Sequence, residues 1–214
     1  MKKIRNIYHK YRKSGSVFII VMARFIIYKL IYKKEILAHQ RVSIRGVKNI
    51  DTKSKLEIGV NYVGFMHKSD KTYLNIDGKL ALKGNCSIGR GCRFDIGRDA
   101  VVTIGGNAFI NVNTNFIISH NLTIGDDCVI SWNCQFLDDD FHEIGYEGKK
   151  NTADSIVIGQ HVWIGCGVSI YKGTVIPDGC VIASNSVIRG KFHVKNAIIG
   201  GNPARVIREN IVWE

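Results

Sequence analysis

The sequence lacks the features that would mark a membrane-spanning, secreted or disordered protein. Two prolines and 22 glycines among 214 residues suit many tight turns rather than a disordered segment. The longest apolar run, residues 17–32, is interrupted by Arg24 and Lys29. At 16 residues, it is also shorter than the roughly 20 apolar residues that a bilayer span needs. No small-residue cleavage site follows it, as a secretory signal would require.

Acidic residues are absent from the first 34 positions, which hold ten of the 30 Lys and Arg residues. A basic, apolar helix over residues 17–32, with Ser16 as candidate N-cap, fits the interface of an anionic membrane. The alternative is a helix that packs on the rest of the protein or on a partner chain. Nucleic-acid binding is not expected, because no recognised binding fold accompanies the basic run.

From residue 158 an aliphatic residue recurs at every sixth position, and a small or β-branched residue follows four places later. This period fits neither an amphipathic helix nor a half-buried strand. It indicates short strands joined by turns around a narrow three-sided prism. Three six-residue sides make one coil, so Ile158 is predicted to stack on Ile176 and Ile164 on Ile182. The small positions are Val162, Val168, Thr174, Cys180 and Ser186, and the same pattern runs upstream with phase changes from Leu82.

The six cysteines do not have the spacing of a disulfide framework. Five of them fall on the small inward position of the repeat, and their spacing of six follows the coil. These are Cys86, Cys92, Cys128, Cys134 and Cys180. We therefore expect reduced thiols in the core, as in a cytosolic protein. No close His-x4-His pair is present, and no catalytic metal is expected.

Two segments carry a resemblance to a known family. They read IVIGQHVWIGCGVSIYKGTVIPDGCVIASNSVI, residues 156–188, and GGNPARVIREN, residues 200–210. The sequence resembles the hexapeptide-repeat acyltransferases over residues 82–210, and most of all the bacterial O-acetyltransferases of capsule and O-antigen polysaccharides. The resemblance implies an all-β solenoid, a left-handed parallel β-helix, which departs from the usual right-handed crossover. It also implies a homotrimer with acetyl-CoA bound between adjacent chains, where Asn111 and His142 are expected from one chain and Ser184, Arg205 and Arg208 mainly from its neighbour.

Two parts of the chain are expected. Residues 1–45 form the basic helical appendage, and residues 46–210 form the β-helix with a catalytic loop at 138–155. Residues 35–80 are expected to provide an irregular first coil or cap, with strands at 56–59 and within 73–84.

The polar stretch of residues 133–155 interrupts the repeat, and loops on a rigid scaffold often carry function. His142 closely follows three consecutive aspartates. The resemblance implies that this histidine is the general base, which takes the proton of the attacking hydroxyl. Asp138 or Asp140 is the expected carboxylate that orients its imidazole. The alternative is a solvated acidic loop with an incidental histidine.

The other site residues follow from the resemblance one position at a time. Asn111 is expected at the acceptor hydroxyl. Trp163 is expected to wall the thioester end of acetyl-CoA, with Cys166 and Ser184 along the pantetheine arm. Cys166 stands where a serine is usual, which leaves its role open. Arg205 and Arg208 are expected near the adenosine phosphates, since guanidinium groups suit phosphate.

The sequence thus predicts an acetyl-CoA-dependent O-acetyltransferase. Its acceptor would be a sugar hydroxyl of a bacterial surface polysaccharide or its precursor. The protein is expected in the cytoplasm, peripheral at the inner face of the cell membrane through residues 1–34. Two alternatives stay open: N-acetylation of a nucleotide-linked amino sugar, and a non-catalytic, membrane-docked scaffold. An intact His142, Trp163 and NPAR segment argue against the scaffold.

Overall fold

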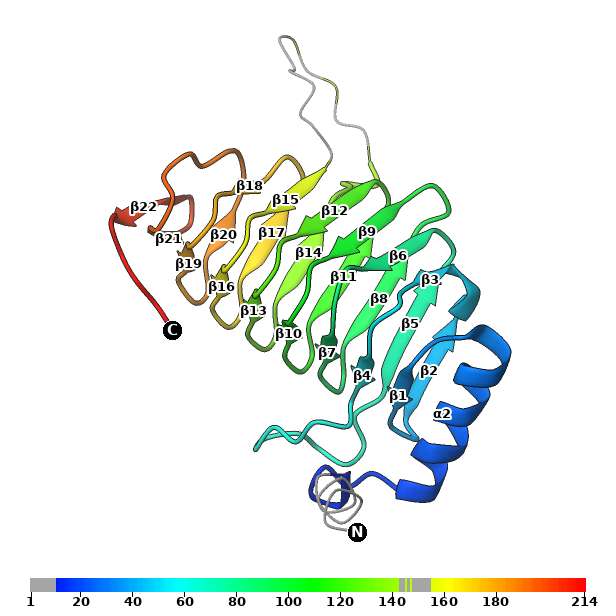
Figure 1. Ribbon diagram of the computed structural model, residues 1–214. Coiled ribbons are helices and arrows are strands. Elements are labelled where there is room, and N and C mark those ends of the chain that lie inside the picture. The colour runs from blue at the N-terminus through cyan, green and yellow to red at the C-terminus, as the bar shows by residue number, and fades with distance from the viewer. Residues whose placement is uncertain (1–10, 143–144, 146, 148–154) are drawn as a thin grey trace.

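Three parallel β-sheets run side by side along one elongated body (Figure 1). The computed structural model describes residues 11–142, 145, 147 and 155–214. Every third strand joins the same sheet, so the chain passes from face A to face B to face C and then starts the next coil. This order makes a three-sided parallel β-helix, and the part of the chain described contains seven successive coils.

Each face is a ladder of short strands. Face A contains β1 (Ile36–Ala38), β4 (Leu56–Ile58), β7 (Cys86–Ile88), β10 (Ala108–Ile110), β13 (Val129–Ile130), β16 (Trp163–Ile164), β19 (Val181–Ile182), β21 (Ile198–Gly201) and β22 (Ala204–Arg208). Face B contains β2 (Val42–Arg45), β5 (Thr72–Ile76), β8 (Arg93–Ile96), β11 (Asn115–Ile118), β14 (Gln135–Leu137), β17 (Ser169–Tyr171) and β20 (Val187–Ile188). Face C contains β3 (Ile50–Asp51), β6 (Lys79–Leu82), β9 (Val101–Ile104), β12 (Asn121–Ile124), β15 (Ile156–Ile158) and β18 (Val175–Ile176). The turns between the faces form an AB corner, a BC corner and a CA corner.

The repeat positions line the interior, as the sequence predicts. Ile158 pairs with Ile176 and Ile164 with Ile182, in register, one coil apart. The five small positions from Val162 to Ser186 are buried as well. Within face B, three buried phenylalanines also stack, with ring centroids 4.3 and 4.5 Å apart. These are Phe94, Phe116 and Phe136, which the six-residue pattern did not single out; stacked rings add to the stability that burial gives.

The cysteines are free thiols, and the five at inward positions are buried. Burial raises the pKa of the Cys86 and Cys92 thiols to about 12. Such thiols are poor nucleophiles near neutral pH, because the thiolate is the reactive form. The prediction that these five cysteines occupy inward core positions is therefore confirmed.

The helix α2 (Phe18–Tyr32) covers the first coil, against β1. Val21 and Tyr28 face the protein, and the Arg24 guanidinium donates to the carbonyls of His39 and Val42 at 2.8 Å each. The prediction of Ser16 as the N-cap of this helix is wrong. The cap position is Val17, which has no capping side chain, and the Ser16 hydroxyl lies 2.8 Å from that of Ser14.

The β-helix begins earlier than the expected boundary at residue 46. β1 and β2 precede that residue and pair in regular register with β4 and β5. Residues 36–82 therefore form the first two coils of the β-helix, with the predicted strands at 56–59 and within 73–84 present as β4, β5 and β6, and with a long connection at 59–71. At the other end, β22 runs antiparallel to β21 and ends the ladder of face A.

Candidate active site

Three of the predicted site residues, with a pair of residues on the coil between them, line up along the AB corner, which faces downward in Figure 1. Strands one coil apart lie about 4.8 Å apart, so this column follows the long axis of the protein. We call it the AB strip: Asn111, Ser131–Trp132, Cys166 and Ser184, on four successive coils. The strip has the linear form that an extended pantetheine arm requires.

Trp163 lies beside the strip on β16 and is 41% exposed. Its indole N–H donates to the hydroxyl of buried Ser131 at 3.1 Å. That bond fixes the ring against the corner, so an apolar wall stands next to Cys166. Ser131 was not predicted; its place in the turn after β13, one coil above Asn111, is the signal that could have found it.

Three backbone N–H groups of the strip have no acceptor among the described residues, those of Trp132, Cys166 and Ser184. Gly165 and Gly167 donate to carbonyls of adjoining coils, whereas the N–H of Cys166 between them donates to no atom of the described residues. The N–H of Ser184 has no acceptor among those residues either. The Cys166 thiol lies 3.4 Å from the Ser184 hydroxyl. The corner therefore presents three unpaired N–H donors and, at Cys166 and Ser184, two small polar side chains.

Asp138 begins the second group of predicted residues, at the BC corner. It is fully buried, and its carboxylate accepts the backbone N–H groups of Ser119 and His120 at 2.7 and 2.9 Å. Burial raises the pKa of this carboxyl, while those two hydrogen bonds act in the opposite direction. Asp138 thus holds the BC corner of the preceding coil, and it does not contact His142.

His142 is exposed and makes no hydrogen bond or ion pair with any described residue. The Asp140 carboxylate lies 2.8 Å from the Lys172 ammonium, and Asp139 lies 3.5 Å from the Nε2 atom of His120. The expected pairing of His142 with Asp138 or Asp140 is therefore not formed in the single chain. Much of the predicted loop, residues 143–144, 146 and 148–154, lies outside the described residues.

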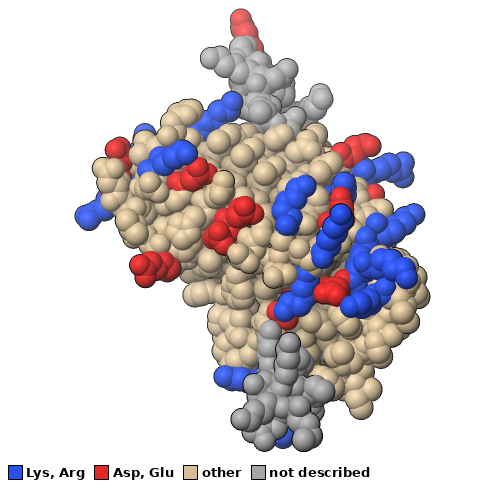
Figure 2. All heavy atoms as spheres, viewed as in Figure 1, with Lys and Arg blue, Asp and Glu red and all other residues tan. Residues whose placement is uncertain are grey.

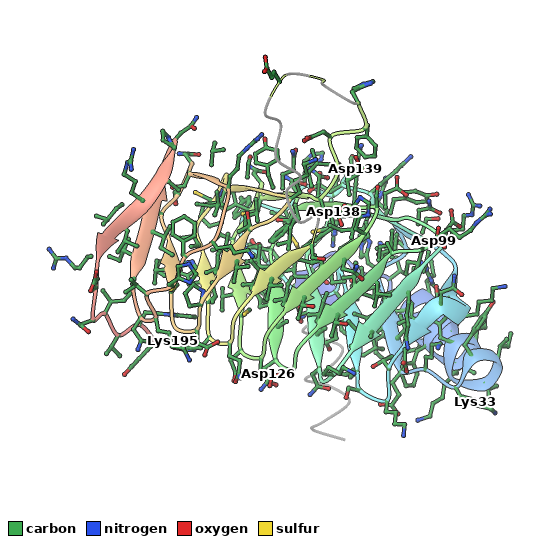
Figure 3. All side chains as sticks on the ribbon, turned by 90° about the horizontal axis from the view of Figure 1, so that it is seen from above. Lys33, Asp99, Asp126, Asp138, Asp139 and Lys195 are labelled. Atoms are coloured by element: carbon green, nitrogen blue, oxygen red, sulfur yellow. The ribbon has the colours of Figure 1, made fainter. Side chains whose placement is uncertain are left out.

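The two groups of residues lie on different corners. Figure 3 shows Asp138 and Asp139 on the edge opposite Asp126, a residue of the CA corner. Asn111 precedes face B, at the AB corner, whereas His142 follows it, at the BC corner. Between these corners a four-residue strand such as β11 spans about 13 Å, at about 3.3 Å per residue. Asn111, Trp163, Cys166 and Ser184 therefore follow one corner of the chain over about three coil spacings, whereas His142 lies at the next corner.

Arg205 and Arg208 are exposed on β22, at the C-terminal end of face A. The chain then folds back so that the Trp213 indole stacks on the His161 imidazole, with centroids 4.0 Å apart and planes at 8°. Trp213 also lies 6.2 Å from the ring of Trp163. The arginines and the tryptophan wall thus share one face of the protein.

Known proteins resemble this chain in sequence and in fold. The family described as "Bacterial transferase hexapeptide (six repeats)" matches residues 155–190. An uncharacterized 24.8 kDa protein in the cps region of Klebsiella pneumoniae is 38% identical, covering 100% of this chain and 97% of the relative. The putative lipopolysaccharide biosynthesis O-acetyl transferase WbbJ of Escherichia coli strain K12 is 30% identical, covering 66% of this chain and 80% of the relative.

Among solved structures, an N-acyltransferase resembles this chain in fold, and at its low sequence identity it supports the fold and nothing further. It is a crystal structure of a mutant of AntD, an N-acyltransferase from Bacillus cereus, in complex with dTDP and coenzyme A. It is 18% identical, covers 86% of this chain and 87% of that chain, and has a TM-score of 0.56.

The three-sided coil, together with relatives that are acetyltransferases, identifies a solenoid enzyme that transfers acyl groups. Together with the matching repeats and the related O-acetyl transferase, this coil shows that the chain belongs to the bacterial hexapeptide-repeat transferase family.

Proposed function

We propose that this acyltransferase moves an acetyl group from acetyl-CoA to a sugar hydroxyl of a bacterial surface polysaccharide or its lipid-linked precursor. The observation that carries the proposal is the AB strip, a straight row of outward N–H donors and small polar side chains beside the Trp163 ring. The names of the relatives support the acceptor class, since one belongs to lipopolysaccharide biosynthesis and another to a cps region.

The active site is completed by two chains of a cyclic homotrimer, each wound as the left-handed β-helix of the family. The support is the separation of the AB strip from His142, which lies on the BC corner of the same chain. A three-fold axis brings the BC corner of one chain against the AB corner of the next. Each of the three equivalent sites then receives His142 from one chain and Asn111, Trp163, Cys166 and Ser184 from its neighbour.

The reaction is a direct acyl transfer without a covalent enzyme intermediate. His142 accepts the hydroxyl proton while the hydroxyl oxygen attacks the thioester carbonyl carbon. The carbon–sulfur bond breaks, and the proton passes from the imidazolium to the departing CoA thiolate. The free N–H of Cys166 suits the negative charge that develops on the carbonyl oxygen, because such donors need no reorganisation during the reaction.

The donor lies along the AB strip, with its thioester beside Trp163 and its pantetheine arm running past Ser184. Arg205 and Arg208 lie further along the same direction, on β22, and they take the phosphates of the adenosine end. Asn111 lies at the other end of the strip, so it contacts the acceptor.

The helix α2 docks the enzyme on an anionic membrane. Its outer face exposes large apolar side chains: Ile19, Ile20, Ile26, Ile27, Leu30 and Ile31, with Ile19 78% and Ile31 67% exposed. Lys and Arg side chains gather over the neighbouring N-terminal coils (Figure 2). No helix of the described residues is both long and apolar enough to cross a bilayer. An apolar face with a basic surround is the pattern of a helix that lies in the membrane interface.

A hollow beside the C-terminal end of α2 supports this orientation. It is lined by Lys34, Lys48 and Lys79 together with Asp51, and Asp51 pairs with Lys79 at 2.9 Å. The lysines give the hollow a net positive charge, which favours lipid phosphates. The enzyme thus works at the cytoplasmic face of the membrane.

The test is transfer from radiolabelled acetyl-CoA to the surface polysaccharide of the producing bacterium, freed of its ester groups by mild alkali. We expect label in the polysaccharide that alkali removes again, because O-acetyl esters are base-labile. Alkali-stable label would identify N-acetylation instead. Absence of transfer to any saccharide, from a protein that binds acetyl-CoA, would contradict the proposed acceptor class.

A further inference from the structure

A loop on the acceptor side of the AB strip carries exposed aromatic side chains. Residues 59–71, here called the aromatic loop, leave face A after β4 and extend along the AB corner (Figure 1). Tyr62 and Phe65 are 46% and 52% exposed. Exposing two such rings costs free energy in water unless a partner covers them.

The aromatic loop reaches across the coil that holds Asn111. Phe65 makes an edge-on contact with Trp132, with ring centroids 5.2 Å apart and planes at 68°. The loop starts on the second coil and Trp132 lies on the fifth, so it rises about 14 Å, or three coil spacings. It therefore forms a wall along the part of the AB strip where the acceptor hydroxyl is expected.

The loop is held in this position by polar contacts beneath it. Arg90 is 2% exposed and lies at the AB corner between the start of the loop and Asn111. Its guanidinium donates to the carbonyls of Gly59, His67 and Ser14. The loop is thus built onto the scaffold, which positions the exposed rings as a binding surface needs.

A basic side chain lies against one of the aromatic rings, and the loop itself carries two more. The Lys13 ammonium lies 5.1 Å from the centre of the Tyr62 ring, within the range of a cation–π contact. Arg12, which precedes Lys13, is exposed, and so are Lys68 and Lys71 within the aromatic loop. The neighbouring carboxylate of Asp70 accepts the backbone N–H of His67 at 2.8 Å. This surface therefore carries a net positive charge.

We propose that Tyr62, Phe65 and Trp132 form an acceptor subsite that stacks on the pyranose rings of an anionic glycan. This inference rests on the proposed function and specifies its substrate class. The apolar C–H faces of pyranose rings pack on aromatic rings, and the basic surround attracts the carboxylates of acidic sugars. The subsite holds sugars next to the one that is acetylated, so the enzyme prefers an oligosaccharide or polymer to a monosaccharide.

The test compares Phe65→Ala, Phe65→Leu and Tyr62→Ala with Tyr73→Ala, a control of similar exposure (43%) on face B. The acceptor is the alkali-treated surface polysaccharide of the producing bacterium. We expect each loop variant to raise the acceptor KM about tenfold, the loss of one aromatic contact. Turnover number, acetyl-CoA affinity and oligomer mass should not change. Phe65→Leu keeps apolar volume but loses the aromatic face, so it should resemble Phe65→Ala.

Each other result contradicts a stated part of the proposal. An unchanged acceptor KM in the loop variants would overturn the subsite while leaving the transfer reaction intact. A changed oligomer mass would show that the rings contact a second copy of the chain. An acceptor KM that is indifferent to salt and to Lys13→Gln would overturn the anionic class.

Failure of the proposed function gives a different result. The wild-type protein would then leave the polysaccharide unlabelled, and calorimetric titration with the same polysaccharide, without acetyl-CoA, still tests the subsite. Binding by the wild type and by Tyr73→Ala but not by Phe65→Ala supports the subsite. Equal binding by the wild type and both variants, or no binding by the wild type, overturns the subsite.

Discussion

Mixed trimers test whether the site is shared between chains, as we propose from the placement of its residues on two corners. Consider one chain with His142→Ala and another with Arg205→Glu and Arg208→Glu. Each parent trimer should be nearly inactive, because every one of its sites lacks either the base or the phosphate contacts. In a mixed trimer, a site is intact where the His142 side comes from the arginine variant and the AB strip comes from the histidine variant.

The recovered activity follows from counting sites. With equal amounts of the two chains and random assembly, each chain type supplies each side of a site half of the time. The required combination therefore occurs in about one quarter of sites, and a cyclic trimer has three equivalent sites. Activity should rise to about 25% of the wild-type value, against a background near zero for either parent.

Asn111 provides a matched control, because the structure places it on the AB corner with the tryptophan wall and away from His142. Asn111→Ala mixed with His142→Ala should also recover about a quarter of the sites. Asn111→Ala mixed with the arginine variant should recover none, since both changes affect the same side of the site. The assay is co-refolding, confirmation of mixed trimers by native mass spectrometry, and acetyl transfer.

Two results would refute the reasoning. Mixed trimers that are no more active than the parents would place the whole site within one chain. Recovery with the Asn111 and arginine pair, but not with the Asn111 and His142 pair, would assign Asn111 and His142 to the same chain.

Three further predictions concern single positions. His142→Ala should lower turnover by about 10²–10⁴-fold, as expected for loss of a general base, while acetyl-CoA affinity by calorimetry stays unchanged; near-normal turnover would exclude that role. Ile27→Asp with Leu30→Asp should abolish sedimentation with anionic vesicles but not activity on soluble acceptor; persistent binding would mean that α2 does not dock. Because burial raises the pKa of Asp138, the unfolded chain releases this proton first. Stability in urea should therefore fall as the pH rises from the ordinary to the raised pKa, and Asp138→Asn should flatten that slope. An unchanged slope would contradict this linkage.

The fold was largely predictable because each coil repeats one physical requirement. An aliphatic side chain must fill the prism at every sixth position, and the pattern from Ile158 to Ile188 expresses that need directly. The strands at 56–59 and within 73–84 were predicted correctly, but the start of the β-helix before residue 46 was missed, because the early segments vary in length, as in the connection that contains the aromatic loop. The Phe94, Phe116 and Phe136 stack was missed because its spacing of 20 to 22 residues exceeds the six-residue period.

The sequence could name candidate site residues, which stay predictions, but not their arrangement. Asp138 shows the limit clearly: its position near His142 in sequence suggested a catalytic pair, yet its carboxylate binds backbone N–H groups of the preceding coil. Neighbours in a solenoid lie one coil away, about 20 residues apart in sequence here, so local spacing is a poor guide to contact. Ser131 beside the Trp163 indole is a second example, with 32 residues between them.

The ends of the β-helix suggest separate routes for the two substrates. α2 and the start of the aromatic loop belong to the N-terminal coils, whereas Arg205 and Arg208 lie at the C-terminal end of the same body (Figure 1). On the proposed function, a lipid-linked glycan would approach from the membrane, at the end that carries α2 and the aromatic loop. Acetyl-CoA would approach from the opposite end, with its phosphates at the proposed arginines. The two ligands then converge at the Asn111 and Trp163 coils, so neither has to leave before the other can bind.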